Sequence, residues 1–340
     1  MRRMNERTVF DTVRGLGPVS CAQLADATGI SKPTVAQAIR SMEAAGLVHA
    51  TGRSSGHLGR TGLLYGVAPD GGYVLAIDIG VRRVRVAVGD LTGTMVERVD
   101  ADSPGDDLAA VADRVVVMVR DALRRVRATR RDVLASVVGS PGAVDPRRAG
   151  LTHVGRLTCL DGVDLATILS RRTRVPMTME NDVNLAALGE QACGMSALNM
   201  VVLSIGDGIG AALILDGRLI RGPRGAAGEI ESVPFDGARG RRQQLLPQSR
   251  GPLTRFVALR VSAIAAITDA ELVVLTGDVG LDSSLLDPVR RIVAGHLAEP
   301  PRLETSELGD SGVLLGCLAS AHAAALERVF SHPLNRERSA

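Results

Sequence analysis

The sequence predicts an α/β protein with a small helix-turn-helix head and a larger two-lobed body. Residues 1–69 contain three short amphipathic helical patterns and two short strand patterns, and the rest contains two similar strand-and-turn units in succession. The basic excess is confined to the head, where eight Lys and Arg residues face four Asp and Glu residues. The other 271 residues hold 32 basic and 33 acidic groups. This asymmetry favours a nucleic-acid-binding head on a near-neutral body.

The composition excludes several classes of protein. The 340 residues suffice for two or three domains with a real core. Aromatic residues make up only 2%, so the core must be aliphatic, and stacking platforms for single-stranded nucleic acid are disfavoured. The first residues contain no apolar run of signal-peptide length, and no stretch approaches the ~20 uninterrupted apolar residues of a membrane span. We therefore expect a cytoplasmic protein with no membrane partner.

The first helix of the head is expected over 7–17, because Val9, Phe10, Val13 and Leu16 are spaced for one apolar face. Gly17 and Pro18 then end it.

Two further helices complete a helix-turn-helix pattern. Ser20 and Gln23 form a capping-box pattern at the start of the second helix. Thr28-Gly29 is a tight turn, Ser31 is expected to cap the third helix, and Gly46 follows its end.

The polar face of the third helix supplies candidate DNA contacts. The N-terminal half of such a helix enters the major groove, where Lys32 and Arg40 could neutralise phosphates and Thr34 and Gln37 could reach base edges. An ordinary solvated helix face in a protein-contact module is the alternative. Strands over 47–50 and 63–67 flank a glycine-rich wing. The predicted DNA-binding set is Ser20, Ser31, Lys32, Thr34, Gln37, Arg40, Arg53 and Arg60.

The body begins near Tyr73. A head over 1–69 is followed by lobes over 70–196 and 197–340, with a closing helix over 311–330 that could pack back on the first lobe. We expect a long helix over 106–129, a strand running into a helix over 177–190, and a β-hairpin over 201–217.

Several ordered phrases in the body resemble the ROK family, which groups transcriptional repressors with sugar kinases in the actin-like ATPase fold. They are DIG (78–80), SPGAVD (140–145), ENDVN (180–184) with AALGE (186–190), and IGDGIGAALILDGRLIRG with GAAGEI (225–230). The head looks like the winged helix of the family's regulators. The resemblance spans nearly the whole chain and implies a two-lobed actin-like domain behind a winged helix-turn-helix domain.

The resemblance also implies a sugar site and two phosphate loops. The aspartate of the END phrase is the general base in ROK kinases and corresponds to Asp182, while Asn181 and Glu229 would contact the sugar. Asp182 could instead be structural and cap the helix that follows. The residues that correspond to the phosphate loops are Asp78, Gly80, Gly206, Asp207 and Gly208.

Other positions depart from the family pattern. The first phosphate loop continues with Val81-Arg82-Arg83 in place of small residues, and Asp207 would repel nucleotide phosphates unless Mg²⁺ intervened. Glu231 and Ser232 stand where the family has a glycine and a sugar-contacting histidine, and Gly155-Arg156-Leu157 stands for its Pro-Asn-Leu phrase.

The cysteine-rich zinc loop of the family also lacks a counterpart. No Cys or His occurs between Glu229 and Glu271, so a structural zinc ion would have no ligands there. The arginine-rich stretch 236–252 is either a solvated linker or a second partner-binding patch. The four cysteines of the chain are far apart, which favours reduced, mostly buried thiols. We therefore expect no cofactor.

These observations predict a DNA-binding transcriptional regulator, a repressor of carbohydrate-related genes with a degenerate or repurposed sugar site. Its expected partners are a double-stranded DNA operator, a sugar or sugar-phosphate effector, and further copies of the chain in a homodimer or homotetramer. The first alternative is an ATP-dependent hexose kinase, which the altered phosphate loops disfavour. The second is a head–body fusion that acts chiefly through protein contacts.

Overall fold

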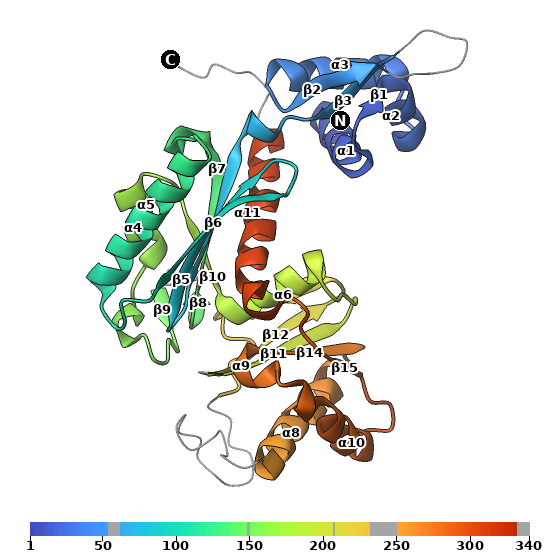
Figure 1. Ribbon diagram of the computed structural model, residues 1–340. Helices are drawn as coiled ribbons and strands as arrows, with labels where there is room; N and C mark the ends of the chain where they lie inside the picture. Colours follow the sequence, from blue (N-terminus) through green and yellow to red (C-terminus); the bar gives the residue numbers. More distant parts are fainter. Residues whose placement is uncertain (54–61, 148–149, 207, 232–249, 332–340) are drawn as a thin grey trace.

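The computed structural model describes residues 1–53, 62–147, 150–206, 208–231 and 250–331. A winged-helix head, a first α/β lobe and a second α/β lobe follow one another along the long dimension of the molecule (Figure 1). The predicted α/β class is confirmed.

The head contains three helices and a three-stranded sheet of order β1-β3-β2. Its elements are α1 (Arg2–Leu16), β1 (Val19–Ser20), α2 (Cys21–Thr28), α3 (Lys32–Ala44), β2 (Val48–Arg53) and β3 (Leu63–Val67). Helix α1 begins five residues before the predicted start. Its first turns lack apolar periodicity, but the i,i+4 ion pairs Arg2–Glu6 and Arg7–Asp11 stabilise them.

The helix caps of the head agree only in part with the sequence pattern. Ser20 and Gln23 form the expected capping box on α2. Ser31 occupies the N-cap position of α3, but its hydroxyl lies 2.8 Å from the Thr34 hydroxyl and makes no cap hydrogen bond to the backbone. The expectation that the Ser31 side chain caps α3 was therefore wrong.

The two lobes repeat one sheet topology. Each has a central strand that pairs antiparallel with the next strand and parallel with a later one. The orders are β10-β7-β4-β5-β6 and, in the same sense, β15-β14-β11-β12-β13. The lobe 1 strands are β4 (Tyr73–Ile79), β5 (Arg83–Asp90), β6 (Met95–Asp102), β7 (Val133–Ser140) and β10 (Thr178–Asn181). The lobe 2 strands are β11 (Met200–Ile205), β12 (Ile209–Leu215), β13 (Arg218–Ile220), β14 (Leu272–Thr276) and β15 (Arg302–Thr305).

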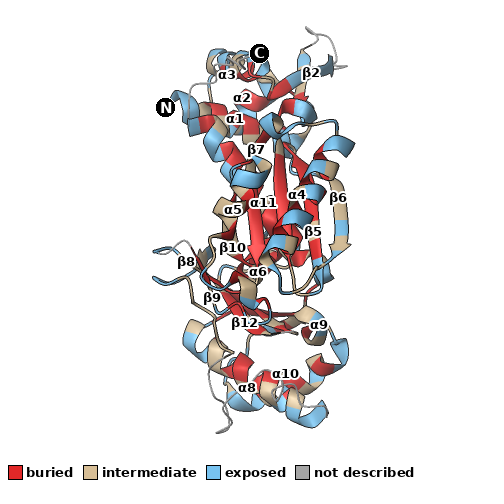
Figure 2. Cartoon of the chain, turned by 90° about the vertical axis from the view of Figure 1, so that its left-hand side faces the viewer, coloured by how far each residue is buried: buried red, intermediate tan, exposed pale blue. Residues whose placement is uncertain are grey.

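Helices cover both faces of the lobe 1 sheet. The outer helices are α4 (Leu108–Arg125) and α5 (Leu165–Thr173), and the helix α11 (Gly312–Ser331) packs on the opposite face beside α6 (Asp182–Cys193) (Figure 1). Figure 2 shows that buried residues concentrate in the two sheets and along α11. The far end of α11 enters the head, where Phe330 packs against Phe10 with ring centroids 5.4 Å apart.

Two helices of lobe 2 were missed by the sequence analysis: α8 (Arg250–Thr268) and α10 (Leu286–His296). Helix α8 begins inside the arginine-rich stretch that was expected to be a linker or a partner-binding patch. It buries Arg260 with its guanidinium 3.3 Å from the centre of the Phe256 ring. A buried cation breaks the apolar pattern that predicts a core helix.

Two stretches, Arg250–Thr268 and Gly309–Ser331, are long and apolar enough by composition to cross a membrane. Both contribute residues to apolar clusters on the sheets, so their composition suits core helices equally well. Of the four cysteines, all free, Cys317 is buried, Cys21 and Cys159 are half-buried and Cys193 is exposed. The expectation of mostly buried thiols was therefore wrong.

Helices α6 and α11 approach each other closely through glycine. A Cβ atom added at Gly316 would overlap the carbonyl oxygen of Leu185, and one added at Gly189 would overlap that of Gly312. The close crossing thus depends on the absence of side chains at these positions.

The substitution Gly316→Val should lower the free energy of unfolding by at least about 2 kcal/mol, because the new side chain must push two packed helices apart. Urea denaturation monitored by circular dichroism measures the change. Gly295→Val is the matched control, because a Cβ atom at Gly295 in α10 meets nothing within 4 Å. Equal destabilisation by the two variants would contradict the crossing argument.

Candidate functional site

The first candidate site is the polar face of α3 in the head. Val35, Ala38, Ile39 and Met42 are buried on the core side of this helix. The other side presents four exposed residues and the half-buried Thr34, and the exposed Arg53 lies at the end of β2. The four are Ser31, Lys32, Gln37 and Arg40.

The cations of this surface are available for a ligand. In the part of the chain that the structure describes, Lys32, Arg40 and Arg53 form no ion pair. Ser20 is engaged in the α2 capping box, where its hydroxyl contacts Gln23. Arg60, the remaining predicted contact, lies outside the described residues.

The second candidate site is the cleft between the lobes. A cavity of about 210 Å³ is lined by the predicted effector residues together with glycines of the predicted phosphate loops. It adjoins a second cavity of about 370 Å³, which reaches Arg82, Arg85 and Asp310. The structure thus brings together residues far apart in sequence, namely Asn181, Asp182, Glu229, Gly80, Gly206 and Gly208. Asp207 lies outside the described residues.

The side chain of Asn181 is held by the fold. Asn181 is the N-cap of α6, and its Oδ1 accepts a hydrogen bond from the backbone N–H of Asn184 at 2.9 Å. Its Nδ2 donates to the carbonyl of Gly142 at 3.0 Å and to Asp182 Oδ1 at 3.2 Å. The suggestion that Asp182 caps this helix was therefore wrong. Asn181 does so, and thereby orients the neighbouring carboxylate.

Asp182 is a carboxyl group of the cleft with a raised pKa. Its Oδ1 accepts a hydrogen bond from the backbone N–H of Val183 at 2.8 Å. Burial, together with the negative charges of Asp78 and Glu229, raises the pKa of Asp182 to about 7. A carboxyl group with this pKa exchanges a proton near neutrality, so it can either accept a hydrogen bond from a hydroxyl or donate one.

Ion pairs occupy the half of the cleft that corresponds to the phosphate loops. Arg85 donates to the buried Asp78 at 2.8 Å and to Asp310 at 2.8 Å. Arg82 pairs with Asp278 across the cleft. Burial raises the pKa of Asp78, although the neighbouring Arg85 opposes the shift.

Sequence reasoning missed three groups of this site. His153, in the left-handed backbone region with φ 59°, lines the cleft beside Arg156. Glu180 joins the two lobes, because its Oε2 accepts from Arg221 Nε at 2.5 Å while its Oε1 accepts from Asn184. Arg85 meets Asp310 across 225 positions of sequence, and no local pattern signals such a pair.

The described residues do not offer the structural zinc site that the family resemblance implies. Among the described residues, no three His, Cys, Asp or Glu side chains are grouped so that they could hold a metal ion. The sequence between Glu229 and Glu271, part of which lies outside those residues, contains no Cys or His.

The fold and the cleft define a class of protein: a two-lobed α/β domain with an interlobe site, preceded by a winged helix. The ROK family model matches residues 74–241 and the MarR family model matches residues 6–58. The body is therefore a ROK-family domain and the head is a winged helix of the MarR type, which confirms the resemblance seen in the sequence.

Known relatives include both regulators and kinases. The xylose repressor of Bacillus spizizenii is 24% identical over 69% of this chain and 62% of its own length. The chain thus spans less than two thirds of that relative. The crystal structure of a ROK family transcriptional regulator, a homologue of the E. coli MLC protein, has a TM-score of 0.74 at 17% identity over 98% of both chains. A ROK glucokinase from Streptomyces griseus has a TM-score of 0.62 at 20% identity, covering 74% of this chain and all of its own.

The substitution Asp182→Asn should make stability less dependent on pH. An aspartate that keeps its proton in the folded state up to pH about 7, but loses it near pH 3.9 when unfolded, lowers stability progressively as pH rises between these values. Asn retains the acceptor oxygen but does not titrate. Urea denaturation should show a larger gain for the variant at pH 8 than at pH 5.

The exposed Asp26→Asn is the control for this measurement and should show no such trend. A gain for Asp182→Asn that is the same at both pH values would contradict the raised pKa.

Proposed function

We propose that this protein is a sugar-responsive transcriptional repressor. The observation that carries the proposal is the combination of a winged-helix head, whose Lys32, Arg40 and Arg53 are free to contact phosphates, with a ROK body. The similarity to a xylose repressor and to a ROK transcriptional regulator supports it. The partner of the head is an operator in double-stranded DNA, and the protein acts in the cytoplasm as a homodimer or homotetramer.

The effector of the body is a sugar or sugar phosphate bound in the interlobe cleft. Carboxylates and amides are the groups that hydrogen-bond sugar hydroxyls, and Asn181, Asp182 and Glu229 line one cavity. Binding there can release DNA only if the sugar has different affinities for the DNA-binding and the free arrangement of the heads.

A sugar kinase is the weaker alternative. Such an enzyme needs a site for nucleotide phosphates and their Mg²⁺, and the corresponding half of the cleft holds the pairs Arg85–Asp78 and Arg82–Asp278. The guanidinium groups of Arg82 and Arg85 are already paired with carboxylates, so they attract added phosphate less strongly than unpaired cations would. We therefore propose that the body has no kinase activity.

Substitutions in α3 should separate phosphate contacts from base contacts. Operator fragments would be selected from genomic DNA with the full-length protein. Their affinities for the protein would then be measured by fluorescence anisotropy over a range of salt concentrations. Arg40→Ala should weaken the binding of all fragments. It should also reduce the slope of log binding constant against log salt concentration by about one, because one phosphate contact is lost. Gln37→Ala should leave this slope unchanged. It should reduce the binding free energy by about 1–3 kcal/mol and relax specificity at one base position. Arg291→Ala, an exposed change in lobe 2, is the control. If no fragment is retained at moderate salt, the proposal fails.

Sugars should change DNA affinity without being phosphorylated. The selected fragment would be titrated with xylose, glucose and other pentoses and hexoses, and the same sugars would be assayed with ATP and Mg²⁺ in a coupled kinase assay. We expect one sugar class to weaken DNA binding at least about fivefold, an effect that corresponds to a typical coupling free energy. Asp182→Asn and Glu229→Gln should reduce this response. Robust ATP-dependent turnover would support the kinase instead.

A further inference from the structure

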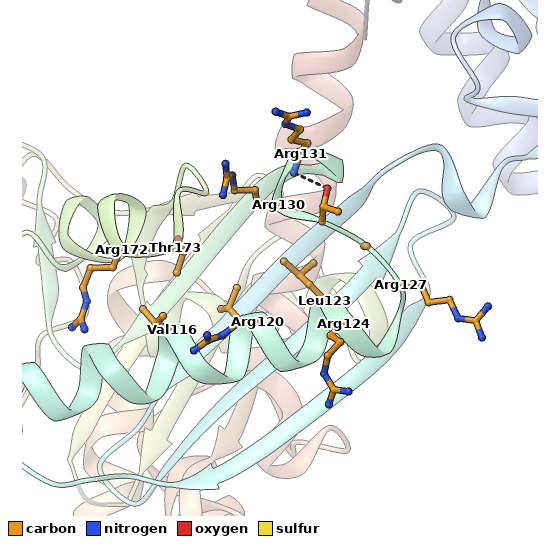
Figure 3. A pocket seen from close by; sticks show the side chains of 12 residues that line it. Val116, Arg120, Leu123, Arg124, Arg127, Arg130, Arg131, Arg172 and Thr173 are labelled. Carbon is orange, nitrogen blue, oxygen red and sulfur yellow. Dashed lines mark hydrogen bonds between the residues drawn. The ribbon is translucent and has the colours of Figure 1, made fainter. Parts of the chain in front are cut away.

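A second pocket lies on the outer surface of lobe 1, away from the interlobe cleft. It has a volume of about 900 Å³ and is formed by the C-terminal half of α4, the end of α5 and the short 3₁₀ helix η2 (Arg130–Asp132) with the loop before it. Figure 3 shows side chains from all three segments around it.

The rim of this pocket is positively charged. Six arginines and no carboxylate are among its lining residues: Arg120, Arg124, Arg127, Arg130, Arg131 and Arg172. Arg124 pairs with Asp121 and Arg172 with Asp113. Across the described ranges of the chain, the other four arginines form no ion pair.

The floor of the pocket is apolar. Val119 and Leu123 line the pocket and are buried, and Val116 and Ala128 line it and are half-buried. Figure 3 shows Val116 and Leu123 among the arginines. A pocket of this size with an apolar floor and a few polar groups is typical of a small-molecule site. Guanidinium groups bind phosphates in bidentate fashion and also stack on planar rings.

The position of the pocket favours a small ligand over the DNA that the head would bind. The pocket opens beside α4 and α5 on lobe 1, whereas α3 lies at the far end of the head (Figures 1 and 2). A bare phosphodiester backbone would also leave the apolar floor uncovered.

The pocket wall leads directly into the joint between body and head. Two residues after η2, Leu134 packs against the apolar core of the head, and its carbonyl accepts a hydrogen bond from Arg328 of α11 at 2.9 Å. A ligand that orders the η2 segment therefore acts next to the contacts that place the head.

We propose that this pocket binds a small ligand that carries several phosphate groups and an apolar or aromatic portion, the chemistry of a nucleoside polyphosphate, and that its occupation changes the DNA affinity of the head. Arg120, Arg130 and Arg131 hold the phosphates, and the floor of Val116, Val119 and Leu123 holds the apolar portion. The regulatory part of this proposal rests on the proposed function of the head.

Calorimetric titration of the full-length protein tests this proposal. The ligands are ATP, GTP, tripolyphosphate and a deca-glutamate peptide, at constant ionic strength and without divalent cations. We expect a nucleotide to bind more tightly than tripolyphosphate, and the peptide not to bind. The variant R120A/R130A/R131A should bind the nucleotide at least about tenfold more weakly, because three charge-assisted contacts are lost. The control R218A/R255A/R291A removes three exposed arginines from lobe 2 and should bind like the parent.

Unchanged nucleotide binding by R120A/R130A/R131A would overturn the proposal and place the nucleotide elsewhere, as would peptide binding without nucleotide binding. To test the link to the head, the affinity for the selected DNA fragment is measured with and without nucleotide. The nucleotide should change this affinity in the parent protein but not in R120A/R130A/R131A. No such change would overturn the regulatory part. If no fragment binds at all, the proposed function fails, while the calorimetric result still decides whether the pocket binds nucleotide.

Discussion

The packing of α11 is the constraint on which the rest of the structure depends. This helix begins next to Asp310 at the interlobe cleft, runs along the lobe 1 sheet and ends in the core of the head at Phe330. Glycines at 189 and 316 let it approach α6, the helix that carries Asp182 at its start. One helix therefore lines the cavity next to Asp182 through Gly312 and Val313, packs in the lobe 1 core and reaches the candidate DNA-binding head.

This arrangement gives a physical route by which the cleft and the head can influence each other. Arg85 holds Asp310 immediately before α11, and Arg328 near the other end bonds to Leu134 between the outer pocket and the head. Packed interfaces of this kind shift between discrete arrangements, so a small change at one end need not fade along the helix. Coupling still requires each ligand to favour one arrangement over the other.

Local patterns predicted the head and the repeated lobes, because capping residues, apolar periodicity and glycine turns act over a few positions. The hairpin at 201–217 and the helix after Asn181 show this. The family resemblance grouped Asn181, Asp182 and Glu229 into one expected site, and all three line the same cavity.

The pairs Arg85–Asp310 and Arg82–Asp278 could not be predicted, since their members are far apart in sequence. Helix α8 was missed because the buried Arg260 interrupts its apolar pattern, and the outer pocket was missed because its arginines come from separate segments.

The charges of the cleft bear on our proposal that this ROK body acts as a sensor and not as a kinase. A sugar is neutral and offers hydroxyl groups, so carboxylates such as Glu229 can bind it without a countercharge. Nucleotide phosphates are polyanionic, and two of the three arginines that line that side of the cleft, Arg82 and Arg85, are paired with Asp278 and with Asp78 and Asp310. These ion pairs disfavour nucleotide phosphates on that side of the cleft. On the outer surface, Arg120, Arg127, Arg130 and Arg131 form no ion pair with the residues that the structure describes, and they lie within 11 positions of one another in sequence. We therefore propose two separate sites, the cleft for hydroxylated ligands and the outer pocket for polyanions, and both adjoin elements that lead to the head.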